Sequence, residues 1–227
     1  MTHTSREVQF AKKLKTTKAW LHFEDGTSFQ GWCNFTSDQL KDGVWGEAAF
    51  TTAMTGYEET ITDPSYLGQH IVFSAAHVGN YESNQLVRQS LGVHASAIIG
   101  RHFSSNDFLE AITIPILSDI DNRALVKYLT DHPEHKSVIT TSATTPTASE
   151  FKNAKLICDE LSRVSVDEAK TIISGDNPIV LIDYGCKKAI IDNLIKLGHP
   201  LKVVPYNTSS ETILSLNPRL IFLSNGP

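Results

Sequence analysis

Residues 179–204 read IVLIDYGCKKAIIDNLIKLGHPLKVV. The stretch opens with four consecutive apolar residues at 179–182, which is typical of a short strand buried on both faces. Residues 187–197 then place apolar side chains on one helical face, and Gly198 follows as a helix-ending residue. A second apolar run at 201–204 completes a strand, helix and strand. This unit predicts a parallel α/β sheet.

The residues that follow extend the same pattern. We expect another helix at 209–216 and a third parallel strand at 220–223. That strand runs into Ser224-Asn225-Gly226-Pro227, and doubly wound folds bind their ligands at the carboxyl ends of such strands. Because a doubly wound domain needs more than three strands to close its core, we expect residues 178–227 to be the incomplete start of one, in a truncated chain.

The first half of the chain is rich in short strands. Residues 20–31, WLHFEDGTSFQG, predict two strands joined by a tight turn at Asp25-Gly26. Further apolar or β-branched runs, separated by Gly, Pro and Asp residues, lie at 46–52, 71–75 and 97–100. The chain is therefore expected to be α/β overall, with a β-rich α+β domain preceding the parallel sheet.

Two helices and a polar linker are expected between these parts. Residues 121–129, DNRALVKYL, form an amphipathic helical pattern that begins at an Asp cap. Residues 140–150, TTSATTPTASE, cannot bury a core and predict a linker, and a helix is expected at 151–163. We divide the chain into a basic tail (1–18), a β-rich domain (19–140), a linker with a helix (141–177) and the α/β domain (178–227).

The charge distribution excludes several classes of partner. The chain of 227 residues carries a net charge of -5. Residues 1–18 hold five basic residues and one acidic residue, so the rest of the chain is acidic. An acidic body does not suit nucleic acid, and we expect the basic tail to be a solvated, frayed terminus. No apolar run suits a targeting peptide or a membrane span, so we expect a cytoplasmic protein with no membrane or nucleic-acid partner.

Cysteine and histidine spacing does not indicate a metal site or a disulfide framework. The three cysteines, Cys33, Cys158 and Cys186, are widely spaced and form no C-x-x-C pair. His132 and His135 flank Pro133 and Glu134 in a polar stretch, which favours a surface turn over metal ligands. A reducing compartment and an absence of bound metal are expected.

Residues 46–80, GEAAFTTAMTGYEETITDPSYLGQHIVFSAAHVGN, contain the most distinctive motifs. At 62–66, Asp63 can accept backbone hydrogen bonds, Pro64 presets the backbone, and the hydroxyl groups of Ser65 and Tyr66 project. Taken alone, these residues favour a structural turn over a binding loop. Glu58 and Glu59 are adjacent and point in different directions, so they make a poor acid–base pair.

The motifs in combination are more specific. M-T-G-Y-x-E at 54–59, T-D-P-S-Y at 62–66, Gln69 and Gly79-Asn80 occur in this order within one short window. The window closely resembles the small, glutamine-hydrolysing subunit of carbamoyl phosphate synthetase. The resemblance covers residues 19–227 in register and includes Glu24-Asp25-Gly26, Gly46-Glu47, 120–125 (IDNRAL), 183–187 (DYGCK) and 222–227 (FLSNGP).

The resemblance implies a two-domain subunit. Its N-terminal domain would be of the swivelling β/β/α type peculiar to this family, and its C-terminal domain a class I glutamine amidotransferase. In that family a Cys, activated by a His paired with a Glu, attacks the glutamine side-chain amide. The ammonia passes to a large subunit, which uses ATP, magnesium and bicarbonate to make carbamoyl phosphate for arginine and pyrimidines. The large subunit and L-glutamine are therefore the expected partners, with no cofactor bound by this chain itself.

The resemblance assigns two binding residues and no catalytic residue. Ser65 corresponds to a position where the N-terminal domain reaches into the glutamine pocket, and Gly226 belongs to the loop that binds glutamine and helps to form the oxyanion hole. The family's nucleophile lies in a G-x-C-x-G-x-Q elbow that residues 1–227 do not contain, and its His and Glu lie later still. Cys186 corresponds to a structural turn, so we expect it to be inert and the chain to be inactive alone.

Two departures from the family's pattern lie in the N-terminal domain. Asn122 replaces the usual Thr of an I-D-T-R motif, and the segment between Arg101 and Ile114 is shorter than usual. If this segment contributes to docking on the large subunit, the interface is altered.

Two other hypotheses remain at this point. The chain could be a non-catalytic module that docks on a synthetase large subunit, in which case it would be a stable monomer in spite of its few sheet strands. A nucleotide-binding α/β protein is disfavoured because no glycine-rich phosphate loop follows the strand at 179–182.

Overall fold

The computed structural model describes residues 3–132, 136–157 and 160–227, so His135 and Cys158 lie outside the described residues. The chain divides into two compact units. The first unit comprises Met1–Ile61, Gly68–Val87 and Ala95–Ile157. The second unit comprises Thr62–Leu67, Arg88–His94 and Cys158–Pro227. Two short segments from the first half of the chain thus belong to the C-terminal unit.

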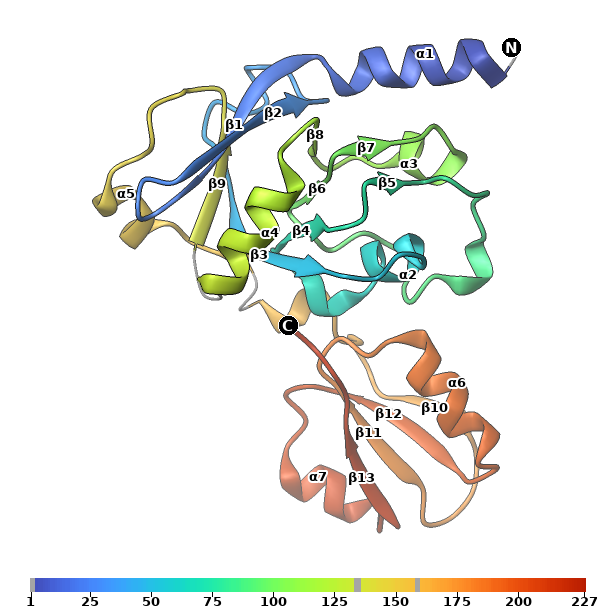
Figure 1. The fold of residues 1–227 in the computed structure, drawn as a ribbon. Helices are drawn as coiled ribbons and strands as arrows, with labels where there is room; N and C mark the ends of the chain where they lie inside the picture. Colours follow the sequence, from blue (N-terminus) through green and yellow to red (C-terminus); the bar gives the residue numbers. More distant parts are fainter. Residues whose placement is uncertain (1–2, 133–135, 158–159) are drawn as a thin grey trace. The chain divides into compact units, whose positions relative to one another are not determined.

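A closed barrel forms the centre of the first unit (Figure 1). Its strands, in chain order, are β1 (Thr17–Phe23), β2 (Ser28–Cys33), β3 (Val44–Thr51), β4 (His70–Phe73), β6 (Ala97–Ile99), β8 (Ile116–Ser118) and β9 (Lys136–Thr140). Around the barrel they follow the order β1-β2-β8-β6-β4-β3-β9, and β9 pairs with β1 to close it. The sequence predicted a β-rich domain but not this closure.

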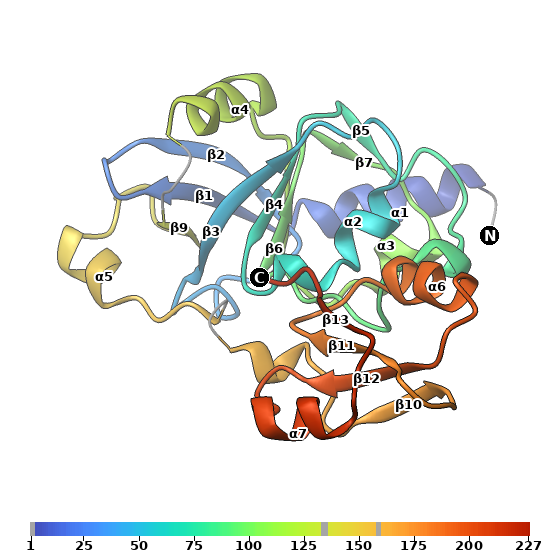
Figure 2. The same cartoon turned by 90° about the horizontal axis from the view of Figure 1, so that it is seen from below.

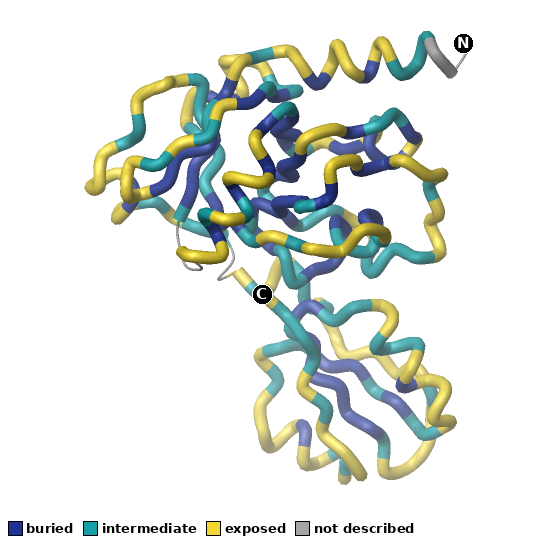
Figure 3. Tube along the Cα trace, viewed as in Figure 1, coloured by how far each residue is buried: buried dark blue, intermediate teal, exposed yellow. Residues whose placement is uncertain are grey.

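Antiparallel and parallel pairs both occur in the barrel. The predicted hairpin is confirmed, because β1 pairs antiparallel with β2 and Gly26 in the turn has a φ of 92°. The pairs β3–β4, β4–β6 and β6–β8 are parallel, which requires connections that leave and re-enter the sheet. The barrel strands are largely buried (Figure 3). The core of the barrel includes Leu21, Ile99 and Ile139, which are fully buried.

Several connections between barrel strands contain a short helix. α4 (Asn122–Asp131) confirms the predicted helix, since the Asp121 side chain accepts a hydrogen bond from Ala124 N at 3.0 Å and Leu125 is buried. Further connections contain α2 (Tyr57–Ile61), α3 (Asp107–Ala111) and the 3₁₀ turn η2 (Gln85–Val87). The first unit also has a two-stranded parallel sheet of β5 (His77–Val78) and β7 (His102–Phe103).

The basic tail is not a frayed terminus, and that prediction was wrong. Residues His3–Leu14 form α1, which belongs to the first unit and buries Phe10 and Leu14. Its Arg6 forms ion pairs with two carboxylates of α3, Asp107 and Glu110. No local sequence pattern indicates these partners, because they lie about a hundred residues away.

The predicted linker is also more ordered than its composition indicates. His22, which is fully buried, makes hydrogen bonds with Thr145 Oγ1 at 3.1 Å and with Ser142 O at 2.9 Å. The helix expected at 151–163 is instead α5 (Ala148–Asn153), started by a capping box of Thr147 and Glu150, and a separate 3₁₀ turn, η4 (Leu161–Arg163). The sequence prediction there was wrong in both start and length.

The second unit contains a four-stranded sheet in the order β10-β12-β11-β13. The predicted strands are confirmed as β11 (Ile179–Asp183), β12 (Leu201–Pro205) and β13 (Leu220–Leu223), and β11 pairs in parallel with both of the others. β10 (Lys170–Ile173) was not predicted, and it pairs antiparallel with β12. The sheet is therefore mixed, with its parallel strands in the positions that the sequence indicated.

The two predicted helices of this unit lie on opposite faces of its sheet (Figures 1 and 2). α6 (Lys188–Lys196) buries Leu194 against Leu181 and Val203. α7 (Ser210–Ser215) buries Ile213 against Val180 and Val204 on the other face. Successive residues of a strand point to opposite faces, so both sides of β11 are covered, as its uninterrupted apolar run requires.

Candidate functional site

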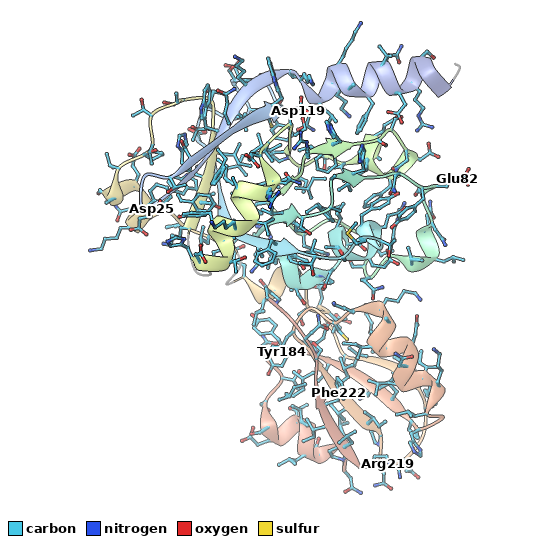
Figure 4. All side chains as sticks on the ribbon, viewed as in Figure 1. Asp25, Glu82, Asp119, Tyr184, Arg219 and Phe222 are labelled. Atoms are coloured by element: carbon cyan, nitrogen blue, oxygen red, sulfur yellow. The ribbon has the colours of Figure 1, made fainter. Side chains whose placement is uncertain are left out.

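The turns that follow β11 and β13 lie next to each other in the second unit. These strands are parallel neighbours, so their carboxyl ends meet at one edge of the sheet. Tyr184 N donates to Ser224 Oγ at 2.9 Å, and Ser224 N donates to Ile182 O at 3.1 Å. Tyr184 is labelled in Figure 4. The candidate site is built on these two turns.

Asp183 shapes the turn after β11. Its side chain is buried, and Oδ1 accepts hydrogen bonds from Gly185 N at 3.0 Å and Cys186 N at 2.7 Å. Oδ2 accepts from Val166 N at 2.8 Å. A buried carboxylate that accepts three backbone hydrogen bonds is well satisfied, so Asp183 acts as a scaffold for this turn.

The turn at residues 62–66 forms as the sequence indicated. Asp63 Oδ1 accepts a hydrogen bond from Ser65 N at 3.0 Å, and Pro64 begins the 3₁₀ turn η1 (Pro64–Tyr66). Asp63 Oδ2 forms an ion pair with Lys187 Nζ at 2.7 Å, and the Asp63 side chain is only 6% exposed. This pair joins η1 to the turn after β11. Burial, with the nearby Asp63 carboxylate as a second cause, raises the pKa of Tyr66.

Ser65 and the loop after β13 are in direct contact. Asn225 Nδ2 donates to Ser65 Oγ at 2.5 Å, and Asn225 Oδ1 accepts from Lys187 N at 3.2 Å. The Asn225 side chain therefore bridges the two turns that carry Ser65 and Lys187. Since Ser65 Oγ acts as the acceptor in this bond, its hydroxyl hydrogen remains able to donate to a ligand.

Gly226 lies against the backbone of the neighbouring turn. A Cβ atom at this position would lie 2.2 Å from Tyr184 O and 2.8 Å from Tyr184 Cβ. Only glycine allows so close an approach without moving one of the two turns. The structure therefore brings Ser65 and the Asn225-Gly226 loop together, which the sequence related only through the family resemblance.

A second segment from the first half of the chain completes this arrangement. Lys188 N donates to Gln89 O at 2.9 Å, and Ala189 N donates to Gln89 Oε1 at 3.2 Å. Gln89 thus satisfies two N–H groups in the first turn of α6, where Lys187 provides no side-chain cap. Gln89 N in turn donates to Thr62 Oγ1 at 2.9 Å, which ties this segment to η1.

Sequence reasoning missed three residues of this network: Lys187, Asn225 and Gln89. Lys187 and Asn225 stand within the D-Y-G-C-K and S-N-G-P motifs, so the motifs themselves contained the signal. Gln89 contacts α6 across 100 positions of sequence, and no local pattern indicates such a contact.

The surroundings of Cys186 support an inert thiol. Burial, with the adjacent Asp183 carboxylate as a second cause, raises the pKa of Cys186 to about 12. The thiolate is the reactive form of cysteine, so Cys186 is almost entirely protonated at neutral pH.

We expect Cys186 to react slowly with iodoacetamide. At pH 8 its alkylation should be at least about 100-fold slower than that of a free cysteine, and should accelerate only as the pH rises toward 12. Peptide mass spectrometry after timed quenching measures the rate for this residue alone, and a Cys186→Ser variant supplies the blank. Labelling of Cys186 at the rate of free cysteine would contradict the inert assignment.

The described residues contain no group of three or more His, Cys, Asp or Glu side chains placed to hold a metal ion. None of the described helices is both long enough and apolar enough to cross a membrane.

Comparison with known proteins identifies the family. Residues 21–139 match the model of the carbamoyl-phosphate synthase small chain, CPSase domain. The chain belongs to this family. Residues 180–227 match the model of the class-I glutamine amidotransferases, so the second match begins within β11.

Similar proteins include several carbamoyl phosphate synthase small chains. The small chain of Caldanaerobacter subterraneus subsp. tengcongensis is 37% identical over 221 residues, covering 92% of this chain and 59% of the relative. The arginine-specific small chain of Halalkalibacterium halodurans is 34% identical over 224 residues, covering 92% and 60%. The small chain of Listeria monocytogenes serovar 1/2a is 36% identical over 226 residues, covering 93% and 61%. The chain spans about three fifths of the length of these relatives.

Proposed function

We propose that this chain forms the N-terminal domain and the start of the amidotransferase domain of a subunit that hydrolyses glutamine for carbamoyl phosphate synthesis. The observation that carries the proposal is the hydrogen bond from Asn225 Nδ2 to Ser65 Oγ at 2.5 Å. It joins two residues 160 positions apart, one in the T-D-P-S-Y motif and one in the S-N-G-P motif, at a single edge of the second unit's sheet.

The topology of the second unit supports a ligand site at this edge. β11 lies between β12 and β13, and the helices that connect the three strands cover opposite faces. This arrangement corresponds to the start of a doubly wound domain, in which the chain reverses its direction of winding at the first strand. Ligands of such domains bind outside the carboxyl ends of the strands that flank this reversal. Those ends carry Asp183–Lys187 and Ser224–Pro227 in this chain.

The polar groups at the edge suit the amino-acid part of glutamine. Ser65 can donate its hydroxyl hydrogen to a carboxylate or carbonyl oxygen. The backbone N–H of Gly226 has no hydrogen-bond partner among the described residues, and it can stabilise an oxyanion. Lys187 adds positive charge through an ammonium group whose side chain is 40% exposed. In this proposal Ser65 and Gly226 bind the substrate, and Lys187, Asp63 and Asn225 hold them in position.

In the proposed reaction the ammonia passes to a large subunit that uses ATP, magnesium and bicarbonate. The names of two arginine-specific relatives, from Halalkalibacterium halodurans and Geobacillus stearothermophilus, support a role in arginine synthesis. A role in pyrimidine synthesis is part of the proposal only through the family. A cytoplasmic location belongs to the same proposal. Burial raises the pKa of both described thiols, Cys33 and Cys186, so neither is activated, and we propose that residues 1–227 do not hydrolyse glutamine by themselves.

An assay of ammonia release tests this function. Residues 1–227 would be compared with an extended protein, in which the remaining amidotransferase domain of the Caldanaerobacter relative follows Pro227. We expect hydrolysis by the extended protein and none by residues 1–227. Turnover by residues 1–227 that a Cys186→Ser substitution removes would contradict the proposal, as would an extended protein that folds but never releases ammonia.

A further inference from the structure

Helix α1 lies outside the part of the chain that matches the family model, which begins at residue 21. It nevertheless packs on the first unit, and Phe10 and Leu14 are buried at 3% and 4% exposure. Elsewhere along α1 the described side chains are mostly exposed or half-buried. The apolar contact of α1 is therefore small, and its other contacts are polar.

The polar contacts of α1 converge on α3. Arg6 Nη2 pairs with Asp107 Oδ1 at 2.5 Å, and Arg6 Nε pairs with Glu110 Oε1 at 2.7 Å. Lys13 Nζ donates to Glu110 O at 3.0 Å, near the end of α3. At the other end of α3, Ser105 N donates to Glu7 Oε1 at 3.1 Å. Side chains of α1 thus contact both ends of α3, a helix of only five residues.

A further ion pair holds the chain just after α1. Lys15 pairs with Asp119, a non-glycine residue with a φ of 55°, which is labelled in Figure 4. The Arg6 guanidinium also lowers the pKa of Glu110, in agreement with an attractive contact. The three ion pairs of this region all have the basic member on or beside α1 and the acidic member in residues 107–119.

α3 in turn supports the first turn of α2. Asn106, the buried N-cap of α3, donates through Nδ2 to Tyr57 OH at 2.8 Å and to Gly79 O at 3.3 Å. Tyr57 OH donates to Tyr81 O at 3.0 Å, and Tyr81 OH accepts from Gly56 N at 2.6 Å. A hydrogen-bonded chain therefore runs from α1 through α3 to the start of α2, entirely within the first unit.

We propose that α1 acts as an electrostatic clamp, formed by the ion pairs of Arg6 and Lys15 with residues 107–119, that salt can release. The clamp orders α3 and, through Asn106, the start of α2. Helices of 12 and five residues are marginal in isolation, so α1 and α3 are expected to depend on each other for their order. The carboxylate of Asp107 is 83% exposed and the side chain of Arg6 is 40% exposed. Ion pairs this exposed are screened by salt, so we expect a rise in ionic strength to release the clamp.

Hydrogen exchange of the full 227-residue chain, followed by mass spectrometry at constant pH, tests this clamp. In Arg6→Gln we expect exchange to rise about fivefold in three segments together: 5–14, 104–111 and 56–60. Exchange of β11 and β12 in the second unit should not change. Near 1 M salt, where the Debye length is about 3 Å, the wild type should reach the exchange of the variant.

Lys12→Gln is the matched control. It removes the same charge from the same helix, and Lys12 forms no ion pair among the described residues. Exchange in Lys12→Gln should equal that of the wild type in all three segments. The proposal is overturned if Arg6→Gln and Lys12→Gln behave alike, or if segment 5–14 loosens while 104–111 and 56–60 keep their protection. A combined Arg6→Gln and Glu110→Gln variant should loosen these segments no further than Arg6→Gln alone.

Discussion

Gly226→Ala is expected to reduce glutamine hydrolysis by the extended protein at least about 100-fold. The new Cβ would lie 2.2 Å from Tyr184 O, so the loop after β13 or the turn after β11 has to move. Displacing one oxyanion donor costs about 100- to 1,000-fold in kcat. The overpacking should also lower the free energy of unfolding of the second unit by about 1–3 kcal/mol. Steady-state ammonia release and urea unfolding measure the two effects.

Gly92→Ala is the matched control for this substitution. Gly92 also lies in the second unit, and nothing lies within 4 Å of a Cβ placed there. We expect its activity and stability to equal those of the unsubstituted protein. If Gly226→Ala were equally harmless, the close contact with Tyr184 would have no role in the site.

Lys187→Met is expected to destabilise the second unit by about 2 kcal/mol and to raise the KM for glutamine. It leaves the Asp63 carboxylate, whose side chain is 6% exposed, without its ionic partner. Breaking a fully buried pair costs about 3–5 kcal/mol. The cost is reduced here because the Lys187 side chain is 40% exposed and water can replace part of the interaction. Urea unfolding of the 227-residue chain measures the loss of stability.

Lys188→Met provides the comparison. Lys188 is the next residue and pairs with Asp192 at 2.5 Å, but both side chains are exposed, at 56% and 41%. An exposed i,i+4 pair contributes about 0.3–0.5 kcal/mol, so this variant should lose little stability. A combined Lys187→Met and Asp63→Asn variant should be more stable than Lys187→Met alone, because no carboxylate then remains buried and unpaired. Equal losses of stability in the Lys187 and Lys188 variants would refute the claim that Lys187 joins η1 to the turn after β11.

The second unit was the more predictable part of the fold. Its strands are short apolar runs, and its helices have clear apolar faces, so the periodicity alone indicated β11, α6, β12, α7 and β13. β10 was missed because Lys170–Ile173 lies at the sheet edge and is mostly exposed, without the apolar run of a central strand.

The first unit was harder to predict because its strand pairing and the packing of α1 depend on contacts between residues far apart in the sequence. The strands could be found from turns and β-branched residues, but the parallel pairing of β3, β4 and β6 depends on partners more than twenty residues away. α1 has no acidic residue in its first turn, and it is held by Arg6 through residues over a hundred positions later. His22 likewise orders a polar segment that composition marks as a linker.

The two departures from the family's pattern have structural counterparts. Asn122 is buried and donates through Nδ2 to Phe73 O at 2.7 Å, which ties the start of α4 to the end of β4. The short segment between Arg101 and Ile114 still contains a helix, α3, and it is held by α1.

The candidate site was predictable from motifs but not from physical reasoning on isolated residues. Ser65 taken alone favoured a structural turn, and η1 is indeed such a turn. The binding role proposed for Ser65 rests on its contact with Asn225, which the sequence alone does not reveal. The same holds for Gly226, whose need for glycine comes from Tyr184 in another turn.

The most direct test of the central claim is the KM for glutamine of the extended protein with Ser65→Ala. If Ser65 donates a hydrogen bond to the substrate, its loss should raise KM about 10- to 100-fold while kcat stays within about threefold. Ser215→Ala, which removes a hydroxyl that bonds to Thr212 O within α7, should leave both constants unchanged. An unchanged KM in Ser65→Ala, in a protein that folds and hydrolyses glutamine, would contradict the claim that Ser65 and the loop after β13 form the glutamine site.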